Sequence, residues 1–126
     1  MLSGKRIALG VTGGIAAYRA AELVSQLKKQ GAEVRVVMTE HACQFIAPLT
    51  LATLSGNPVH TDLFAARDEI AHIALAKWAD LFVVAPATAN ALAKFAGGVA
   101  DDLLSTTFLA MRCPVLLAPA MNAAMW

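Results

Sequence analysis

Charged residues are scarce in this sequence. They make up 15% of the 126 residues, whereas about 25% is usual in globular proteins. Ten Lys and Arg stand against nine Asp and Glu, which gives a formal net charge of +1. This balance excludes the strongly basic surface that is typical of nucleic-acid-binding domains. Disorder is excluded as well, because 58% of the residues are hydrophobic and disordered chains combine low hydrophobicity with high charge.

Cysteines and long apolar runs are also few. Cys43 and Cys113 make no disulfide framework, show no metal-ligand spacing with the histidines, and are interpreted as small hydrophobes that pack in the interior. The apolar runs, such as 81–87 and 114–121, fall far short of the roughly 18 residues of a membrane-spanning helix. The first residues lack the pattern of a signal peptide. We therefore expect a cytoplasmic protein with no membrane partner, no nucleic-acid partner and no metal.

Aromatic residues make up only 6% of the chain, so its hydrophobic surplus consists mainly of Ala, Leu and Val. A domain of this size has a large surface relative to its volume and cannot bury all of these side chains internally. Two explanations fit the surplus. One is a homo-oligomer with apolar interfaces, and the other is a fragment of a longer chain.

Short apolar runs alternate with longer helical patterns along the chain. The apolar runs predict buried strands at 6–11, 33–38, 81–85 and 114–118. The helical patterns cover 15–30, 40–54 with a second helix beginning at Pro48, 72–77, 88–95 and 101–111. This alternation predicts an α/β fold with a parallel sheet covered on both faces. Ligands of such folds bind beyond the carboxyl ends of the strands, so the loops after residues 11, 38, 85 and 118 are the candidate site.

Gly13 and Gly14 follow the first predicted strand. Small residues there let a phosphate approach backbone N–H groups at the start of a helix. Thr12 occupies the second glycine position of the dinucleotide fingerprint, and no Gly-Lys-Ser/Thr of a P-loop follows. The loop therefore favours a mononucleotide phosphate or a phosphate ester over NAD or ATP. A tight strand-to-helix turn that needs glycines fits it equally well.

Polar residues in the other loops each have a structural and a functional interpretation. Thr39 and Thr88 can cap helices or bind a ligand. Asn122 can cap a helix or hold the carboxylate or amide group of a ligand. His72, which is flanked by apolar residues, is a core histidine with satisfied hydrogen bonds or a general base near neutral pH.

Residues 86–90 and the pair at 101–102 are the remaining candidate site segments with two interpretations. Small residues at 86–90 leave room for a flat group against the backbone, with a turn and helix cap as the alternative, and Pro86 is expected to end the strand ladder. The neighbouring Asp101 and Asp102 point apart on a helix, which favours a charge in the first helical turn over a catalytic carboxylate pair.

Each of these segments is weakly specific, but their order resembles one known family. The segments are 13–18, 38–40, 45–48, 72–73, 78–81, 85–90, 98–103, 119–122 and 125–126. Together they resemble the flavin-dependent cysteine decarboxylases, and most closely the phosphopantothenoylcysteine decarboxylases of coenzyme A synthesis. The resemblance spans nearly the whole chain.

The resemblance implies a three-layer α/β/α, Rossmann-like (flavodoxin-like) sandwich. It implies FMN bound between the subunits of a homotrimer, with trimers that assemble into dodecamers. The small-molecule substrate would be 4′-phosphopantothenoylcysteine, which loses CO2 to give 4′-phosphopantetheine. In bacteria such a domain usually precedes a phosphopantothenate–cysteine ligase in one bifunctional protein.

Site residues follow from the matching positions. The resemblance implies cofactor contacts at Gly13, Gly14, Ile15, Ala16, Thr39, Phe45, Pro86, Ala87, Thr88, Ala89 and Asn90. It makes His72 the catalytic base and gives Asn122 and Met125 to the substrate. In the family mechanism the flavin oxidises the cysteinyl thiol, the carboxylate leaves as CO2, and the reduced flavin returns the electrons.

One feature departs from the family pattern. The proton-donating cysteine of the family follows the Pro-Ala-Met-Asn segment, whereas Cys113 precedes Pro119 in this sequence. We therefore expect residues 1–126 to be a single flavin-binding decarboxylase domain that is incomplete at its C-terminal end and for full turnover. Three alternatives stay open: a peptidyl-cysteine decarboxylase, a flavin prenyltransferase, and a non-catalytic flavoprotein subunit such as a phosphatase regulator or an electron carrier.

Overall fold

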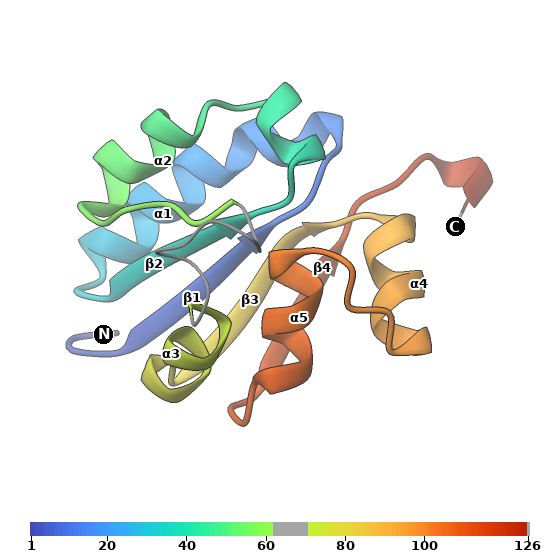
Figure 1. The fold of residues 1–126 in the computed structure, drawn as a ribbon. Helices are drawn as coiled ribbons and strands as arrows, with labels where there is room; N and C mark the ends of the chain where they lie inside the picture. Colours follow the sequence, from blue (N-terminus) through green and yellow to red (C-terminus); the bar gives the residue numbers. More distant parts are fainter. Residues whose placement is uncertain (62–70, 126) are drawn as a thin grey trace.

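A computed structural model of the chain describes residues 1–61 and 71–125. Its centre is a parallel sheet with the strand order β2-β1-β3-β4 (Figure 1). The strands are β1 (Arg6–Val11), β2 (Glu33–Met38), β3 (Leu81–Ala87) and β4 (Val115–Pro119). All of them lie where the apolar runs predict them.

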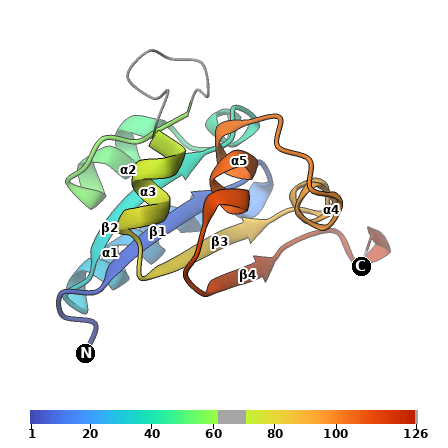
Figure 2. The same cartoon turned by 60° about the horizontal axis from the view of Figure 1, so that its bottom comes forward.

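Helices cover both faces of this sheet (Figures 1 and 2). The α-helices are α1 (Ala20–Lys29), α2 (Pro48–Ser55), α3 (Ala71–Trp78), α4 (Ala89–Gly97) and α5 (Leu103–Ala110), and the 3-10 turns are η1 (Ile15–Arg19), η2 (His41–Gln44) and η4 (Ala123–Met125). Helices α1 and α2 pack on one face, and α3 and α5 pack on the other. The predicted three-layer α/β/α fold is confirmed. No helix in the two described ranges is long and apolar enough to cross a membrane.

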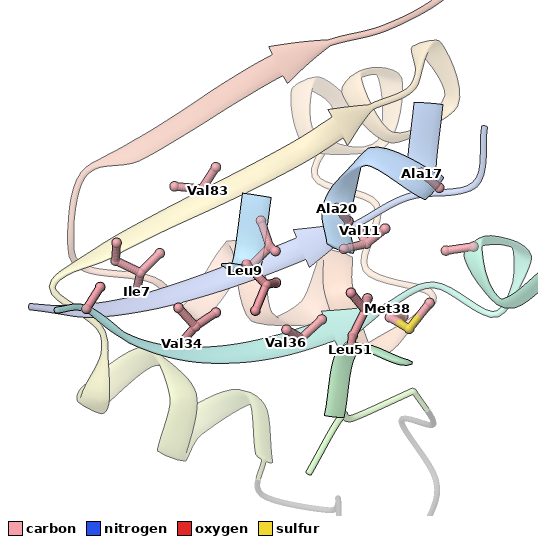
Figure 3. Packing of buried hydrophobic residues seen from close by; sticks show 13 residues of the cluster. Ile7, Leu9, Val11, Ala17, Ala20, Val34, Val36, Met38, Leu51 and Val83 are labelled. Carbon is pink, nitrogen blue, oxygen red and sulfur yellow. The ribbon is translucent and has the colours of Figure 1, made fainter. Parts of the chain in front are cut away.

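Strand β1 shows why the predicted strands lack an alternating pattern. Ile7, Leu9 and Val11 point toward α1 and belong to one buried cluster, which Figure 3 shows from close by. Ala8, the residue between them, belongs to a second cluster with Phe82 on the opposite face. Because both faces are buried, every position of the strand after Arg6 is apolar. The edge strand β4 differs, since Val115 and Leu116 are exposed.

Several boundaries differ from the sequence prediction by one or two residues, and two differences lie beside the candidate site. The helix predicted over 15–30 begins as the 3-10 turn η1 and becomes α-helical at Ala20. Strand β3 does not end before Pro86 but continues to Ala87, with a register shift between Val84 and Ala87. A proline has no N–H for the ladder, and the shift lets the pairing with β4 resume beyond it. Pro86 therefore interrupts the ladder without ending it.

The cysteines behave as the sequence predicts. Cys43 packs against the cluster on the α1 face and Cys113 against the cluster on the α5 face. Burial is the largest influence on both thiols and raises the pKa of each above its ordinary value. Both are free cysteines that stay protonated near neutral pH.

Candidate functional site

A cleft of about 1430 Å³ opens at the carboxyl edge of the sheet. The loop after each described strand lines it, with residues 12–16, 39–41 with 44, 86 with 88–91, and 120–122 with 125. Small-molecule sites usually enclose about 300–1,000 Å³, so this cleft has room for a cofactor together with a substrate. It lies where the strand order reverses between β1 and β3, which is the usual ligand position in open parallel sheets.

Thr12 joins the two loops at that reversal. Its hydroxyl donates a hydrogen bond to the carbonyl oxygen of Pro86 at 2.5 Å and accepts one from the N–H of Thr88 at 3.0 Å. The side chain is almost fully buried, with 1% of its surface exposed. A threonine at this place therefore fixes the distance between the β1 and β3 loops, which a glycine could not do.

Gly13 leaves no room for a side chain. A Cβ atom at this position would lie 2.2 Å from Cδ2 of His41 and 2.7 Å from its Cβ. At Gly14 an added Cβ would meet only the methyl group of Thr88, at an ordinary 3.4 Å. Close packing thus requires the first glycine, as the tight-turn interpretation predicts. Among the described residues, the N–H groups of Gly13 and Gly14 donate to no backbone acceptor, so they remain available to a ligand.

The loop after β2 is held by a helix cap. The hydroxyl oxygen of Thr39 accepts a hydrogen bond from the N–H of Ala42 at 3.0 Å, and Ala42 is fully buried. The capping interpretation of Thr39 is therefore right. This cap fixes the turn η2, which places Glu40, His41 and Gln44 on the cleft wall.

Helices α4 and α5 form the opposite wall. Thr88 caps α4 by accepting from the N–H of Ala91 at 3.2 Å. Asp102 caps α5 by accepting from the N–H of Ser105 at 2.7 Å. The Nζ atom of Lys94 lies 2.9 Å from Asp101 and 3.2 Å from Asp102, and so ties the two helices together.

These contacts set the protonation states of Asp102 and Lys94. Burial of Asp102 disfavours its charged form, but the hydrogen bonds from Ser105 and the contact with Lys94 outweigh burial and lower the pKa of the carboxyl group. The hydrogen bond to Asp101 is the largest influence that raises the pKa of Lys94. The aspartates therefore serve a helix cap and an ion pair and do not form an acid–base pair. The predicted charge in the first helical turn is wrong, because α5 begins at Leu103 and its first turn contains no acidic residue.

The cleft brings together most of the residues that the sequence predicts for the site. On its surface are Gly13, Gly14, Ile15, Ala16, Thr39, Pro86, Thr88, Ala89, Asn90, Asn122 and Met125. Ala87 does not line it, because its side chain is fully buried in the cluster on the α5 face. Phe45 does not line it either, and its ring lies 5.6 Å from that of His41. Trp126 lies outside the described residues.

His72 lies away from this cleft, on the first turn of α3. Its side chain is half-buried, and Nδ1 is buried without a hydrogen-bond partner among the described residues. Buried polar atoms are nearly always hydrogen-bonded. The interpretation as a core histidine with satisfied hydrogen bonds is therefore wrong.

Sequence reasoning missed part of the cleft wall. It overlooked Glu40, His41, Gln44, Lys94, Phe95, Leu104 and Ser105 as lining residues. The glycine pair at 97–98 could have indicated this wall of the cleft. A helix break between Lys94 and Asp102 lets the end of one helix meet the start of the next.

Comparisons with known proteins agree with this geometry. The family model described as Flavoprotein matches residues 1–126. The chain is 52% identical to the coenzyme A biosynthesis bifunctional protein CoaBC of Bacillus subtilis, with 100% of the chain and 32% of the relative covered. It is 54% identical to CoaBC of Escherichia coli K12, with 99% of the chain and 31% of the relative covered. The chain thus spans about a third of the length of these relatives.

Solved structures share the fold. The FMN-dependent cysteine decarboxylase SpaF superimposes with a TM-score of 0.90 at 41% identity, covering 100% of this chain and 74% of SpaF. A PPC decarboxylase variant complexed with pantothenoylaminoethenethiol superimposes with a TM-score of 0.80 at 33% identity, covering 98% of this chain and 70% of that one. With a match over its whole length and the same parallel sheet, this chain belongs to the Flavoprotein family.

Proposed function

We propose that this chain is an FMN-dependent decarboxylase domain that converts 4′-phosphopantothenoylcysteine to 4′-phosphopantetheine and CO2 in coenzyme A synthesis. The observation that carries the proposal is the single cleft that gathers the Gly13–Gly14 loop, the small residues at 86–91 and Asn122 at one sheet edge. The identity to CoaBC of 52–54% supports the same activity. A phosphopantothenate–cysteine ligase half stays a prediction from the resemblance, and a cytoplasmic location stays a prediction from the sequence composition.

The residues at this edge fit FMN. The N–H groups of Gly13 and Gly14 can donate to a phosphate, and the small side chains at Ala89 and Ala16 leave space for a flat ring system. When bound, the flavin supplies the two-electron oxidation of the cysteinyl thiol that turns the neighbouring carboxylate into a leaving group.

Two threonine hydroxyls can add donors to the phosphate site. Thr39 and Thr88 each use an oxygen lone pair to cap a helix turn. A hydroxyl group that accepts one hydrogen bond still carries a proton to donate. Both side chains can therefore cap their helices and hold an anion at the same time, which removes the conflict between the two interpretations.

Asn122 can also hold a turn and bind a ligand at the same time. Its Oδ1 atom accepts a hydrogen bond from the N–H of Ala124 at 2.8 Å. This contact fixes the side chain and leaves both amide hydrogens to donate. We assign these donors to the carboxylate of the substrate, where they would orient the group that departs as CO2, with Met125 beside it.

We infer that His72 acts as the base in the cleft of a second copy. Its side chain is half-buried and so partly open to a neighbouring molecule, and the cleft of its own chain lies elsewhere. The apolar side chains of Ile15, Tyr18 and Ile73 are 79%, 56% and 46% exposed, as expected for a surface that a second copy covers. This supports the homotrimer that the resemblance implies, with a dodecamer as its higher assembly.

Release of CO2 from phosphopantothenoylcysteine tests the proposal. We expect the flavin-loaded protein to release CO2, and His72→Asn to lower the rate by about 100-fold, the usual size of a general-base contribution. The visible flavin spectrum should be the same in both. Lys77→Gln, a change at an exposed position of the same helix, is the matched control and should keep the wild-type rate. Equal rates for wild type and His72→Asn would refute the base assignment, and a protein that binds no flavin would refute the function.

A peptidyl-cysteine decarboxylase is the second candidate. The observation that favours it is the fold shared with the peptidyl-cysteine decarboxylase EpiD, with a TM-score of 0.86 at 26% identity. Turnover of a peptide with a C-terminal cysteine, and none of phosphopantothenoylcysteine, would decide for this candidate.

A further inference from the structure

The cleft contains few side chains that can carry positive charge. Among its described lining residues the carboxylates are Glu40, Asp101 and Asp102, and the lysine is Lys94. Lys94 already contacts both aspartates, at 2.9 Å and 3.2 Å, so its charge is neutralised locally. Arg19 lies outside this cleft and donates to the hydroxyl of Tyr18. Of the described lining residues, His41 is the one left that can present a positive charge to an anion.

The position of His41 is fixed by the turn that carries it. The turn η2 is held by the Thr39 cap and by the buried side chain of Ala42. Phe45 lies beside the imidazole, with a ring separation of 5.6 Å and an angle of 52°. The side chain of His41 is therefore directed by its neighbours, although it is exposed to solvent.

The imidazole lies against the loop that is expected to hold the phosphate. Its Cδ2 atom would be 2.2 Å from a Cβ on Gly13. In an imidazole ring, Nε2 is bonded to Cδ2, so this nitrogen lies at the same edge of the loop. The side chain of His41 is therefore a neighbour of the Gly13–Gly14 loop, whose N–H groups donate to no backbone acceptor among the described residues.

We propose that His41 binds the phosphate monoester of the flavin nucleotide and makes its retention depend on pH. This inference rests on the proposed FMN site. The imidazolium form donates a hydrogen bond and pairs with the phosphate charge, and the neutral form loses the pairing. Histidine changes its charge between about pH 5 and pH 8, so the preference for the phosphorylated flavin falls over that range.

Other titratable groups around His41 do not produce the same dependence. The Gly13–Gly14 loop carries none. On the β2 side, the titratable groups beside His41 are Glu40 and Cys43, and Cys43 stays protonated because its pKa is raised. Across the cleft, Asp102 stays ionised and Lys94 stays charged, because their pKa values are shifted away from neutrality, and Asp101 is paired with Lys94 at 2.9 Å. The phosphate itself gains charge as the pH rises, which strengthens binding to main-chain amides and opposes the effect of His41.

Flavin binding tests the inference without any activity measurement. Quenching of flavin fluorescence gives the Kd of FMN and of riboflavin at pH 6 and pH 8 for wild type, His41→Gln and His41→Lys. We expect the FMN preference of the wild type, expressed as the ratio of the two Kd values, to fall by about fivefold from pH 6 to pH 8. His41→Gln should have the low ratio at pH 6, and His41→Lys, which stays charged, should keep the high ratio at pH 8.

The outcomes separate this inference from the proposed function. The same pH profile in wild type and His41→Gln would overturn the role of His41 and leave FMN binding intact. Binding of neither flavin by the wild type would overturn the proposed function and this inference together. If His41→Gln instead raises the KM of phosphopantothenoylcysteine but not of pantothenoylcysteine, with the flavin ratio unchanged, the histidine serves the phosphate of the substrate and the flavin assignment is wrong.

Discussion

The hydroxyl group of Thr12 donates to the carbonyl oxygen of Pro86 and accepts from the N–H of Thr88. These bonds cross between the loops after β1 and β3, which are 74 and 76 residues apart in sequence. One buried side chain therefore helps to set the spacing of the cleft walls at this point, beside the hydrogen bond from the N–H of Thr12 to the same carbonyl oxygen at 3.3 Å.

Thr12→Val should weaken both the fold and the cleft. It keeps the shape of the side chain but leaves the N–H of Thr88 without its partner, which costs about 1–3 kcal/mol of unfolding free energy. Urea unfolding of the flavin-free protein measures this loss. We expect Thr12→Ser, which keeps the hydroxyl, to lose less. A valine variant as stable as wild type would show that the bridge contributes nothing.

Gly13→Ala should impair flavin binding by displacing His41. The added Cβ would lie 2.2 Å from the ring and 2.7 Å from Cβ of His41, so the turn η2 must move. We expect the Kd of FMN to rise by about tenfold or more, as for a loss near 1.4 kcal/mol. The double variant Gly13→Ala/His41→Gly removes the clash and should tolerate the alanine better than the wild-type background does. Equal effects of the alanine in both backgrounds would contradict the steric explanation.

Asp102 should give a stability contribution that disappears in acid. The pKa of its carboxyl group is lowered in the folded protein. The contribution is therefore fully present above the ordinary aspartate pKa of about 3.9 and is lost as the pH falls through the lower folded-state value.

Two substitutions of Asp102 separate its cap from its charge. Asp102→Asn keeps a capping side chain and removes the charge beside Lys94, whereas Asp102→Ala also removes the cap and should cost about 1 kcal/mol more. Urea unfolding of each variant between pH 7 and pH 3 measures these losses. The difference between wild type and Asp102→Asn should shrink below pH 4. Asp101→Asn, at a more exposed carboxylate, is the control with the smaller effect, and a difference that stays constant with pH would argue against the ion pair.

Asn122→Asp should affect the substrate and spare the cofactor. The substitution keeps the acceptor for the N–H of Ala124, removes the amide donors and places a negative charge near the substrate carboxylate. We expect the KM of phosphopantothenoylcysteine to rise by about tenfold or more, with an unchanged Kd for FMN. An unchanged KM would remove Asn122 from the substrate site.

Local pattern was enough to predict the sheet. Strands β1 and β3 are buried on both faces, so each contains a continuous apolar run, and the loops after the four strands meet at one edge by the geometry of a parallel sheet. The prediction that Pro86 ends its strand was wrong, because the pairing of β3 with β4 shifts register around it. No local pattern contains that information, since it depends on the neighbouring strand.

The site was predictable only in part, for a similar reason. Gly13, Thr39 and Asn122 lie within three residues of the ends of strands, so the sequence points to their edge. His41 and Lys94 join the cleft through tertiary contacts, with Gly13 and with the aspartates at the start of α5. The position of His72 outside the cleft of its own chain is also a property of the folded molecule.

Strand β1 pairs with β2 on one side and β3 on the other, and its side chains enter both buried clusters. Its amide protons should therefore exchange with deuterated solvent only when the whole domain unfolds. Since Thr12 and Gly13 follow this strand directly, a ligand in the cleft would rest on the slowest-exchanging segment of the molecule. Motions that admit or release it would then have to come from segments outside the sheet, such as the turn η4, whose residues are all exposed.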